Sequence, residues 1–161
     1  MIINAQVRVD HLAIARRYVA SQDDWPLAPR FDPTQRWYHR LTAETDHEVW
    51  LLTWLPGQGT DLHDHGGSAG AFVVVSGELT ERTVDNPRTV GAERARLVNS
   101  SFTAGDGHRF GPHHVHQITN NSGRPAVSVH VYGPALTTMT RYELDGDRLR
   151  IASIDRAGVA W

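Results

Sequence analysis

The chain contains neither cysteine nor lysine among its 161 residues. The absence of cysteine excludes disulfides, thiolate metal ligands and a cysteine nucleophile, and the absence of lysine excludes Schiff-base chemistry on a lysine amine. No apolar run approaches the ~20 residues that a membrane-spanning helix requires. The formal net charge is -2 and the arginines form no dense cluster, so we expect neither a membrane nor a nucleic acid as partner. The first residues lack the basic region and apolar core of a signal peptide, which predicts a cytoplasmic protein.

The rest of the composition predicts one globular domain over residues 1–161, because 40% hydrophobic and 21% charged residues are ordinary values for a soluble protein. Residues 10–20 predict a short helix that Asp10 can cap. Residues 21–35 carry the prolines and aspartates typical of a loop. We therefore divide the domain into a helix and loop (1–35), a β-barrel core (36–136) and a C-terminal hairpin (137–155).

Beyond residue 35 the pattern is all-β. Short segments of branched and aromatic residues alternate with turn residues, which favours a closed barrel or jelly roll. Residues 47–55 are apolar on both faces and predict a buried central strand, whereas residues 105–112 are rich in glycine and predict a loop. Asp145-Gly146 suits the tight turn of a terminal hairpin. The predicted core strands are 36–41, 47–55, 62–65, 71–84, 95–99, 114–119 and 126–132.

Histidine is abundant, with ten residues, and the informative ones form two clusters. His63 and His65 stand two apart, so on a strand their imidazoles point to one face and can hold one metal ion. The second cluster, His113, His114 and His116, can supply a third ligand. We expect the other histidines to be solvated or structural (His11, His39 and His47), with His108 and His113 on a loop at the rim of the barrel.

The first cluster resembles the first motif of the cupin superfamily, G-x5-H-x-H-x(3,4)-E-x6-G. Gly57, His63, His65 and Gly77 fall in place, and Gly70 stands at the glutamate position. The site would then have three neutral imidazoles and no carboxylate, with a metal that keeps its full positive charge. About three adjacent positions on an octahedral ion would stay open, which favours an anionic substrate such as a thiolate.

The second cluster resembles the second cupin motif, G-x5-P-x-G-x2-H-x3-N. Gly105, His116 and Asn120 match, while the internal proline and glycine positions do not. This register selects His116 as the third ligand and leaves His114, on the same strand face, as its rival. Glu81 lies well beyond Gly77, and we interpret it as a rim or structural carboxylate. The resemblance implies a cupin jelly-roll barrel, a double-stranded β-helix, with a short N-terminal helix.

A narrower resemblance links the chain to the cysteine dioxygenase (thiol dioxygenase) family. It covers residues 36–136 and is carried by Trp54-x8-His63-x-His65, Ser68, the G-x-L-x-E run at 77–81, His116-x-Ile118-x-Asn120 and the PAVSVHVYGP run at 125–134. The resemblance implies that His63, His65 and His116 bind ferrous iron, Fe(2+). A small-molecule thiol would bind through its sulfur, and O2 would convert it to a sulfinic acid.

The resemblance also implies three catalytic residues, Ser128, His130 and Tyr132, which match the Ser-His-Tyr relay of the family. Their i, i+2, i+4 spacing places them on one strand face. Arg40 stands where cysteine-specific members carry the arginine that pairs with the substrate carboxylate, and Arg36 is the competing candidate.

The sequence leaves several readings open. L-cysteine is the expected substrate, but 3-mercaptopropionate or another small thiol is an alternative, as is a non-catalytic cupin that binds a metal and a small molecule. Three histidines also suit zinc, nickel, copper or manganese. We expect a monomer or small homo-oligomer. Gly70 also stands where some family members carry a cysteine crosslinked to the active-site tyrosine, so this chain cannot form that crosslink.

Overall fold

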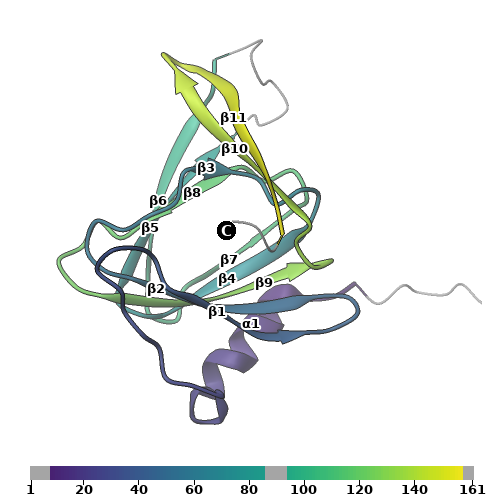
Figure 1. The fold of residues 1–161 in the computed structure, drawn as a ribbon, viewed down its shortest axis with the longest axis vertical. Coiled ribbons are helices and arrows are strands. Elements are labelled where there is room, and N and C mark those ends of the chain that lie inside the picture. The colour runs from purple at the N-terminus through teal and green to yellow at the C-terminus, as the bar shows by residue number, and fades with distance from the viewer. Residues whose placement is uncertain (1–7, 86–93, 158–161) are drawn as a thin grey trace, which may run out of the picture.

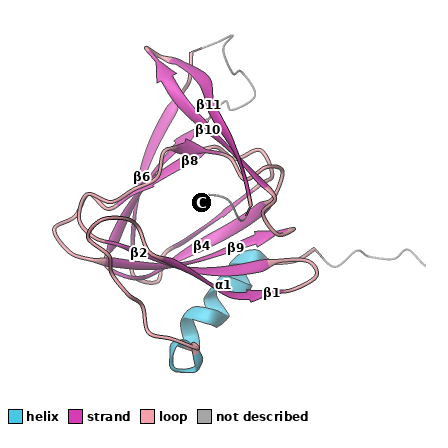
Figure 2. Ribbon diagram, in the orientation of Figure 1, coloured by secondary structure: helices cyan, strands magenta, loops and turns pink. Residues whose placement is uncertain are grey.

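Two antiparallel β-sheets face each other in the computed structural model, which describes residues 8–85 and 94–157 (Figures 1 and 2). The ends of the predicted domain, 1–7 and 158–161, lie outside these ranges. One sheet has the order β1-β2-β9-β4-β7 and the other β11-β10-β3-β8-β5-β6. The strands are β1 (Tyr38–Ala43), β2 (Glu48–Trp54), β3 (Leu62–His63), β4 (Ala69–Ser76), β5 (Glu78–Val84), β6 (Leu97–Thr103), β7 (Gly107–Phe110), β8 (His116–Thr119), β9 (Ala126–Gly133), β10 (Thr138–Asp145) and β11 (Arg148–Arg156). The predicted all-β class is confirmed.

The predicted helix forms as α1 (His11–Ala20) and packs on the outer face of the five-stranded sheet. Asp10 caps it, because its carboxylate accepts a hydrogen bond from the Ala13 backbone N–H at 3.1 Å. Ile14 and Ala15 are buried against valines of β2, β4 and β9. No helix within the described ranges is long and apolar enough to cross a membrane.

Strand β9 is buried on both of its faces, one of which is apolar and the other polar. Val127, Val129 and Val131 point outward into the layer beneath α1. The alternate residues Ser128, His130 and Tyr132 point into the barrel, because successive side chains of a strand face opposite sides. The apolar face anchors the strand, and the polar face is thereby presented to the interior.

Two predicted segments differ from the structure. The predicted strand 71–84 is divided into β4 and β5 at Gly77, which has a positive φ of 79° and approaches the backbone oxygen of Pro125 too closely for a side chain. The predicted loop 105–112 contains strand β7, which pairs with β4. Gly107 lies under the helix, where a Cβ atom would meet a Leu12 methyl group at 2.7 Å. Glycine serves close packing here, and the interpretation as a loop was wrong.

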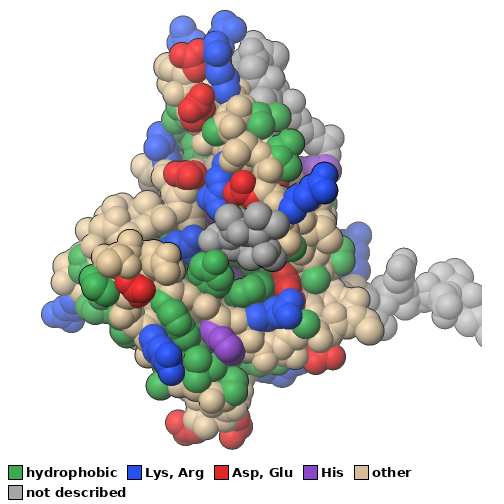
Figure 3. All heavy atoms as spheres, viewed as in Figure 1, with side chains coloured by type: hydrophobic (Ala, Val, Ile, Leu, Met, Phe, Trp, Pro, Cys, Tyr) green, Lys and Arg blue, Asp and Glu red, His purple; other side chains and the backbone are tan. Residues whose placement is uncertain are grey.

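The predicted hairpin forms from β10 and β11 around a turn at Gly146, whose φ is 63°. Strand β10 also pairs with β3, with Arg141 opposite His63. Charged side chains of both signs are interspersed over the face in Figure 3, without a large patch of one sign.

Candidate metal centre and active site

The three predicted ligands His63, His65 and His116 meet inside the barrel. His63 lies on β3 directly opposite His116 on β8, and His65 follows β3. The ring centroids are 5.0 Å apart for His63–His65, 4.7 Å for His63–His116 and 4.9 Å for His65–His116. One ring nitrogen from each lies within 4.8 Å of the others, and all three residues are buried. The arrangement is a three-histidine metal site.

Hydrogen bonds leave the Nε2 atoms of two ligands free for a metal. His63 donates from Nδ1 to the Asp61 carbonyl at 2.8 Å, and His116 donates from Nδ1 to Glu81 at 2.7 Å. Such bonds fix the ring orientation of metal-binding histidines. His65 is 1% exposed, and within residues 8–85 and 94–157 neither of its ring nitrogens has a hydrogen-bond partner. A buried nitrogen without a partner is costly, and a metal bound to His65 would give one of these two nitrogens a partner.

The electrostatics also suit a metal. Burial lowers the pKa of His63 and of His65 well below 6.5, and the nearby His116 lowers both further. Burial also lowers the pKa of His116, although the hydrogen bond to Glu81 opposes that shift. The three imidazoles are therefore neutral near pH 7, which is the form that binds a metal.

Of the two predicted readings of Glu81, as a rim or a structural carboxylate, the structure agrees with the structural one. Its side chain is 1% exposed and accepts hydrogen bonds from His108 at 2.5 Å, His114 at 3.2 Å and His116 at 2.7 Å. Burial alone would raise the pKa of Glu81, but these three hydrogen bonds outweigh burial and hold it well below its usual value. His108, predicted on a loop, lies on β7. The carboxylate that the ligand set lacks is therefore one hydrogen bond away, behind His116.

Phe110 occupies the space beside Gly70. A Cβ atom on Gly70 would lie 2.2 Å from the Val131 backbone oxygen and 2.8 Å from the Phe110 ring. The Phe110 ring stacks on His65, with centroids 4.7 Å apart. Neither a glutamate nor a cysteine fits at this position without a backbone shift. The space next to Gly70 is therefore filled by an aromatic contact with His65.

The predicted relay residues form one buried hydrogen-bonded chain. Ser128 Oγ lies 2.8 Å from His130 Nε2, and the Tyr132 hydroxyl lies 3.3 Å from His130 Nδ1. The chain has a fourth member, because the indole N–H of Trp54 donates to Ser128 Oγ at 2.8 Å. Burial lowers the pKa of His130 to about 3 and raises the pKa of Tyr132, so both are neutral near pH 7. The Tyr132 ring lies 5.1 Å from that of His65, which places the end of the chain beside the metal site.

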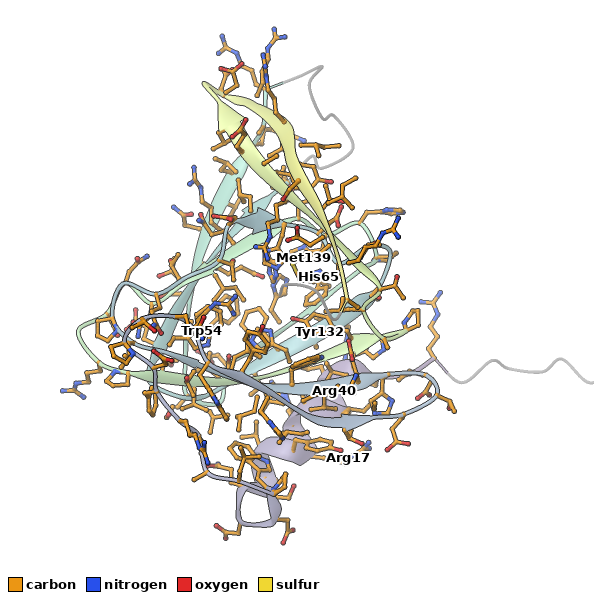
Figure 4. All side chains as sticks on the ribbon, in the orientation of Figure 1. Arg17, Arg40, Trp54, His65, Tyr132 and Met139 are labelled. Atoms are coloured by element: carbon orange, nitrogen blue, oxygen red, sulfur yellow. The ribbon has the colours of Figure 1, made fainter. Side chains whose placement is uncertain are left out.

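A small pocket of about 60 Å³ connects these parts. Trp54, His65 and Tyr132 lie between the two sheets in Figure 4. His63, His116, His130 and Tyr132 contribute polar groups to the pocket wall, and the apolar wall is formed by Trp50, Leu52, Trp54, Ile118, Leu136 and Met139. No acidic side chain is among the described residues that line it.

Arg36, and not Arg40, contributes to this pocket. The Arg36 guanidinium carbon lies 4.9 Å from the centre of the Trp54 ring, and no carboxylate within the described ranges is close enough to form an ion pair with it. Burial lowers the pKa of Arg36, although an arginine remains charged. The Arg40 side chain is 53% exposed and lies 3.7 Å from Glu48. Arg141 also lines the pocket, but it is hydrogen-bonded to Asp155 at 2.5 Å.

The sequence model of the family described as Cysteine dioxygenase type I matches residues 1–145. The chain belongs to this family. It is 26% identical to cysteine dioxygenase type 1 of Rattus norvegicus over 153 residues, which covers 86% of this chain and 71% of the rat protein. The human cysteine dioxygenase type 1 is 26% identical over 145 residues, with the same coverage. The family resemblance inferred from the motifs is therefore confirmed.

Solved structures confirm the cupin fold. A double-stranded β-helix protein from Klebsiella pneumoniae superposes with a TM-score of 0.56 at 20% identity, covering 83% of this chain and 95% of that protein. A cupin protein from Desulfovibrio desulfuricans superposes with a TM-score of 0.53 at 17% identity, covering 70% and 95%. At these identities the likeness concerns the fold alone. Within the fold of this cysteine dioxygenase family member, the sequence reasoning missed Trp54 as a partner of Ser128, although the tryptophan was part of the motif.

Proposed function

We propose that this family member is a ferrous thiol dioxygenase that oxidises L-cysteine to cysteine sulfinic acid. The observation that carries the proposal is the buried cluster of His63, His65 and His116, in which a shared metal ion would give one of the two unpartnered His65 nitrogens a partner. Ferrous iron held by the three histidines would activate O2 and pass to it the electrons that the thiolate sulfur gives up. The reaction is balanced without a further reductant, because a thiolate and O2 together contain all the atoms of a sulfinate.

The metal site favours an anionic sulfur ligand. Three neutral histidines leave the charge of a divalent ion uncompensated, and Glu81 reaches the ion only through His116. A thiolate brings its own negative charge into a pocket whose described lining residues include no acidic side chain. Burial of the opposite charges together is more favourable than burial of either alone.

Arg36 is the residue that we propose for the substrate carboxylate. It is charged, lines the pocket and is held over Trp54 without a competing ion pair among the described residues. A guanidinium can bind a carboxylate through two parallel hydrogen bonds. Arg40, which the family resemblance favoured, is the alternative ligand of the carboxylate, and substitution of each arginine in turn distinguishes the two. Tyr132 would direct its hydroxyl toward the substrate, and His130 would orient it.

A second candidate substrate is 3-mercaptopropionate, which has the same thiol and carboxylate but no amine. The absence of an acidic side chain among the described lining residues favours it, because a substrate ammonium group finds no carboxylate there. Cysteine would have to bind through a neutral amine. Both substrates carry the carboxylate that Arg36 would bind, and they differ only in the amine of cysteine.

The test is oxygen uptake by protein loaded with ferrous iron, with L-cysteine, 3-mercaptopropionate and 2-aminoethanethiol as substrates. We expect the two thiols that carry a carboxylate to be turned over in preference to 2-aminoethanethiol, and cysteine first, with one sulfinate formed for each O2 consumed. A sulfinate from neither thiol at full iron occupancy would favour a non-catalytic metal-binding cupin.

A further inference from the structure

Trp54 contacts both the proposed carboxylate site and the Ser128–His130–Tyr132 chain. Its side chain is fully buried at the end of β2. The face of its ring carries the Arg36 guanidinium at 4.9 Å, a distance at which a cation is attracted to the ring. Its edge donates the indole N–H to Ser128 at 2.8 Å. One side chain therefore touches two groups that the proposed reaction uses for different purposes.

The indole N–H gives the hydrogen-bonded chain a direction. An indole nitrogen is a donor only, so Ser128 must accept from Trp54. The Ser128 hydroxyl hydrogen then needs an acceptor, and His130 Nε2 is the remaining partner of this hydroxyl within the described residues. If Nε2 were protonated instead, the hydroxyl hydrogen would be buried without an acceptor, which is unfavourable. His130 therefore carries its single proton on Nδ1.

This tautomer determines what Tyr132 can do. His130 Nδ1–H donates to the Tyr132 oxygen, so the Tyr132 hydroxyl hydrogen is not used within the chain. Tyr132 lines the pocket, and its free hydrogen can be donated to a ligand there. In the reverse direction the Tyr132 hydrogen would be directed at His130, and the phenol would offer the substrate only an acceptor.

We propose that Trp54 is a positioning residue that sets the direction of the Ser128–His130–Tyr132 hydrogen bonds and, through its ring face, the place of Arg36. The proposal rests on the proposed thiol dioxygenase function for its catalytic meaning. The direction of the hydrogen bonds is a property of the folded chain and is measured without turnover.

The direction of these hydrogen bonds is tested by NMR of the full chain, labelled with 15N-histidine and loaded with zinc, a diamagnetic ion. The protonated and unprotonated ring nitrogens are distinguished by chemical shift, and the His130 signals are assigned by their loss in His130→Gln. We expect the wild-type protein to carry the His130 proton on Nδ1. A wild-type proton on Nε2 would overturn the proposal, and this result needs no Trp54 variant to fold.

Trp54→Phe should release the direction, because a water can then occupy the space of the indole N–H and accept the Ser128 hydroxyl hydrogen, so that Ser128 can accept from His130 Nε2–H. We expect the His130 signals to move from one tautomer to a mixture. The matched control is Trp50→Phe, since Trp50 lines the same pocket but its indole nitrogen has no hydrogen-bond partner in the described part of the chain. This control should leave the His130 tautomer unchanged. A folded Trp54→Phe variant with an unchanged tautomer would overturn the role of Trp54.

Turnover by the iron-loaded variant separates the two contacts of Trp54. With L-cysteine, Trp54→Phe should lower kcat about tenfold, the effect of about 1.4 kcal/mol that one oriented hydrogen bond provides, and raise KM. With 2-aminoethanethiol only kcat should fall, because that thiol does not use Arg36. An equal rise of KM for both thiols would refute the link to Arg36. If the wild type oxidises no thiol, the proposed function fails, whereas the tautomer result still decides the direction.

Discussion

Replacing Arg36 with glutamine should remove the only cation in the described part of the pocket that has no ion-pair or hydrogen-bond partner, while the three histidines stay in place. A hydrogen bond to a charged group contributes about 1.5–3 kcal/mol. The kcat/KM for L-cysteine should therefore fall by roughly 10- to 150-fold. For 2-aminoethanethiol, which has no carboxylate, kcat/KM should change little.

Arg40→Gln is the matched control, because it makes the same substitution four residues along the chain. The Arg40 side chain is 53% exposed and its contact with Glu48 is 3.7 Å long. Glu48 is itself buried, at 3% exposure, so the variant should lose some stability. Neither side chain lines the pocket, so kcat/KM of the folded variant should change by less than about fivefold. The assay is initial oxygen uptake at several cysteine concentrations, with iron content measured for each protein. A larger loss in Arg40→Gln than in Arg36→Gln would refute the assignment and restore Arg40.

Three further predictions concern the metal site, its packing and its response to pH. Glu81→Gln should weaken metal binding by about 10- to 100-fold, because His116 loses its carboxylate partner. Titration of the metal against a chelator measures this affinity, and an unchanged affinity would show that Glu81 does not support His116 as a ligand. Gly70→Ala should lower the free energy of unfolding in urea by about 1–3 kcal/mol, whereas Gly123→Ala, where a Cβ atom meets open space, should not. Equal losses in the two variants would contradict the close packing around Gly70. Burial lowers the pKa of His130 from 6.5 to about 3. Between these pH values His130 is protonated in the unfolded chain but not in the folded one, so the metal-free protein loses stability as the pH falls. From pH 7 to 4.5 this residue should account for a loss of about 2–3 kcal/mol, and His130→Gln should have a correspondingly flatter pH profile.

The sequence was sufficient for the parts of the site that depend on local spacing. His63 and His65 share a face because they stand two apart, and the cupin motif selected His116 over its neighbour His114. The structure agrees with that register, since His116 pairs directly with His63. The polar face of β9 was predictable for the same reason, because Ser128, His130 and Tyr132 are alternate residues of one strand.

The sequence was insufficient where a role depends on pairing between distant strands. Glu81 appeared remote because it lies beyond Gly77, but β5 pairs with β8 and brings its carboxylate to His116. The choice between Arg36 and Arg40 depends in the same way on residues of β2. Glu48 contacts Arg40 and the Trp54 ring holds Arg36, and neither contact follows from the spacing of the arginines.

The most direct test of the proposed function is turnover of L-cysteine by the iron-loaded protein under 18O2. Because His63, His65 and His116 provide the only ligands that we assign to the metal, a variant with His65→Ala is the matched negative control. We predict cysteine sulfinic acid with both of its sulfinate oxygens labelled, and none from the control. Unlabelled product, or oxidation to the disulfide alone at full iron occupancy, would contradict a thiol dioxygenase.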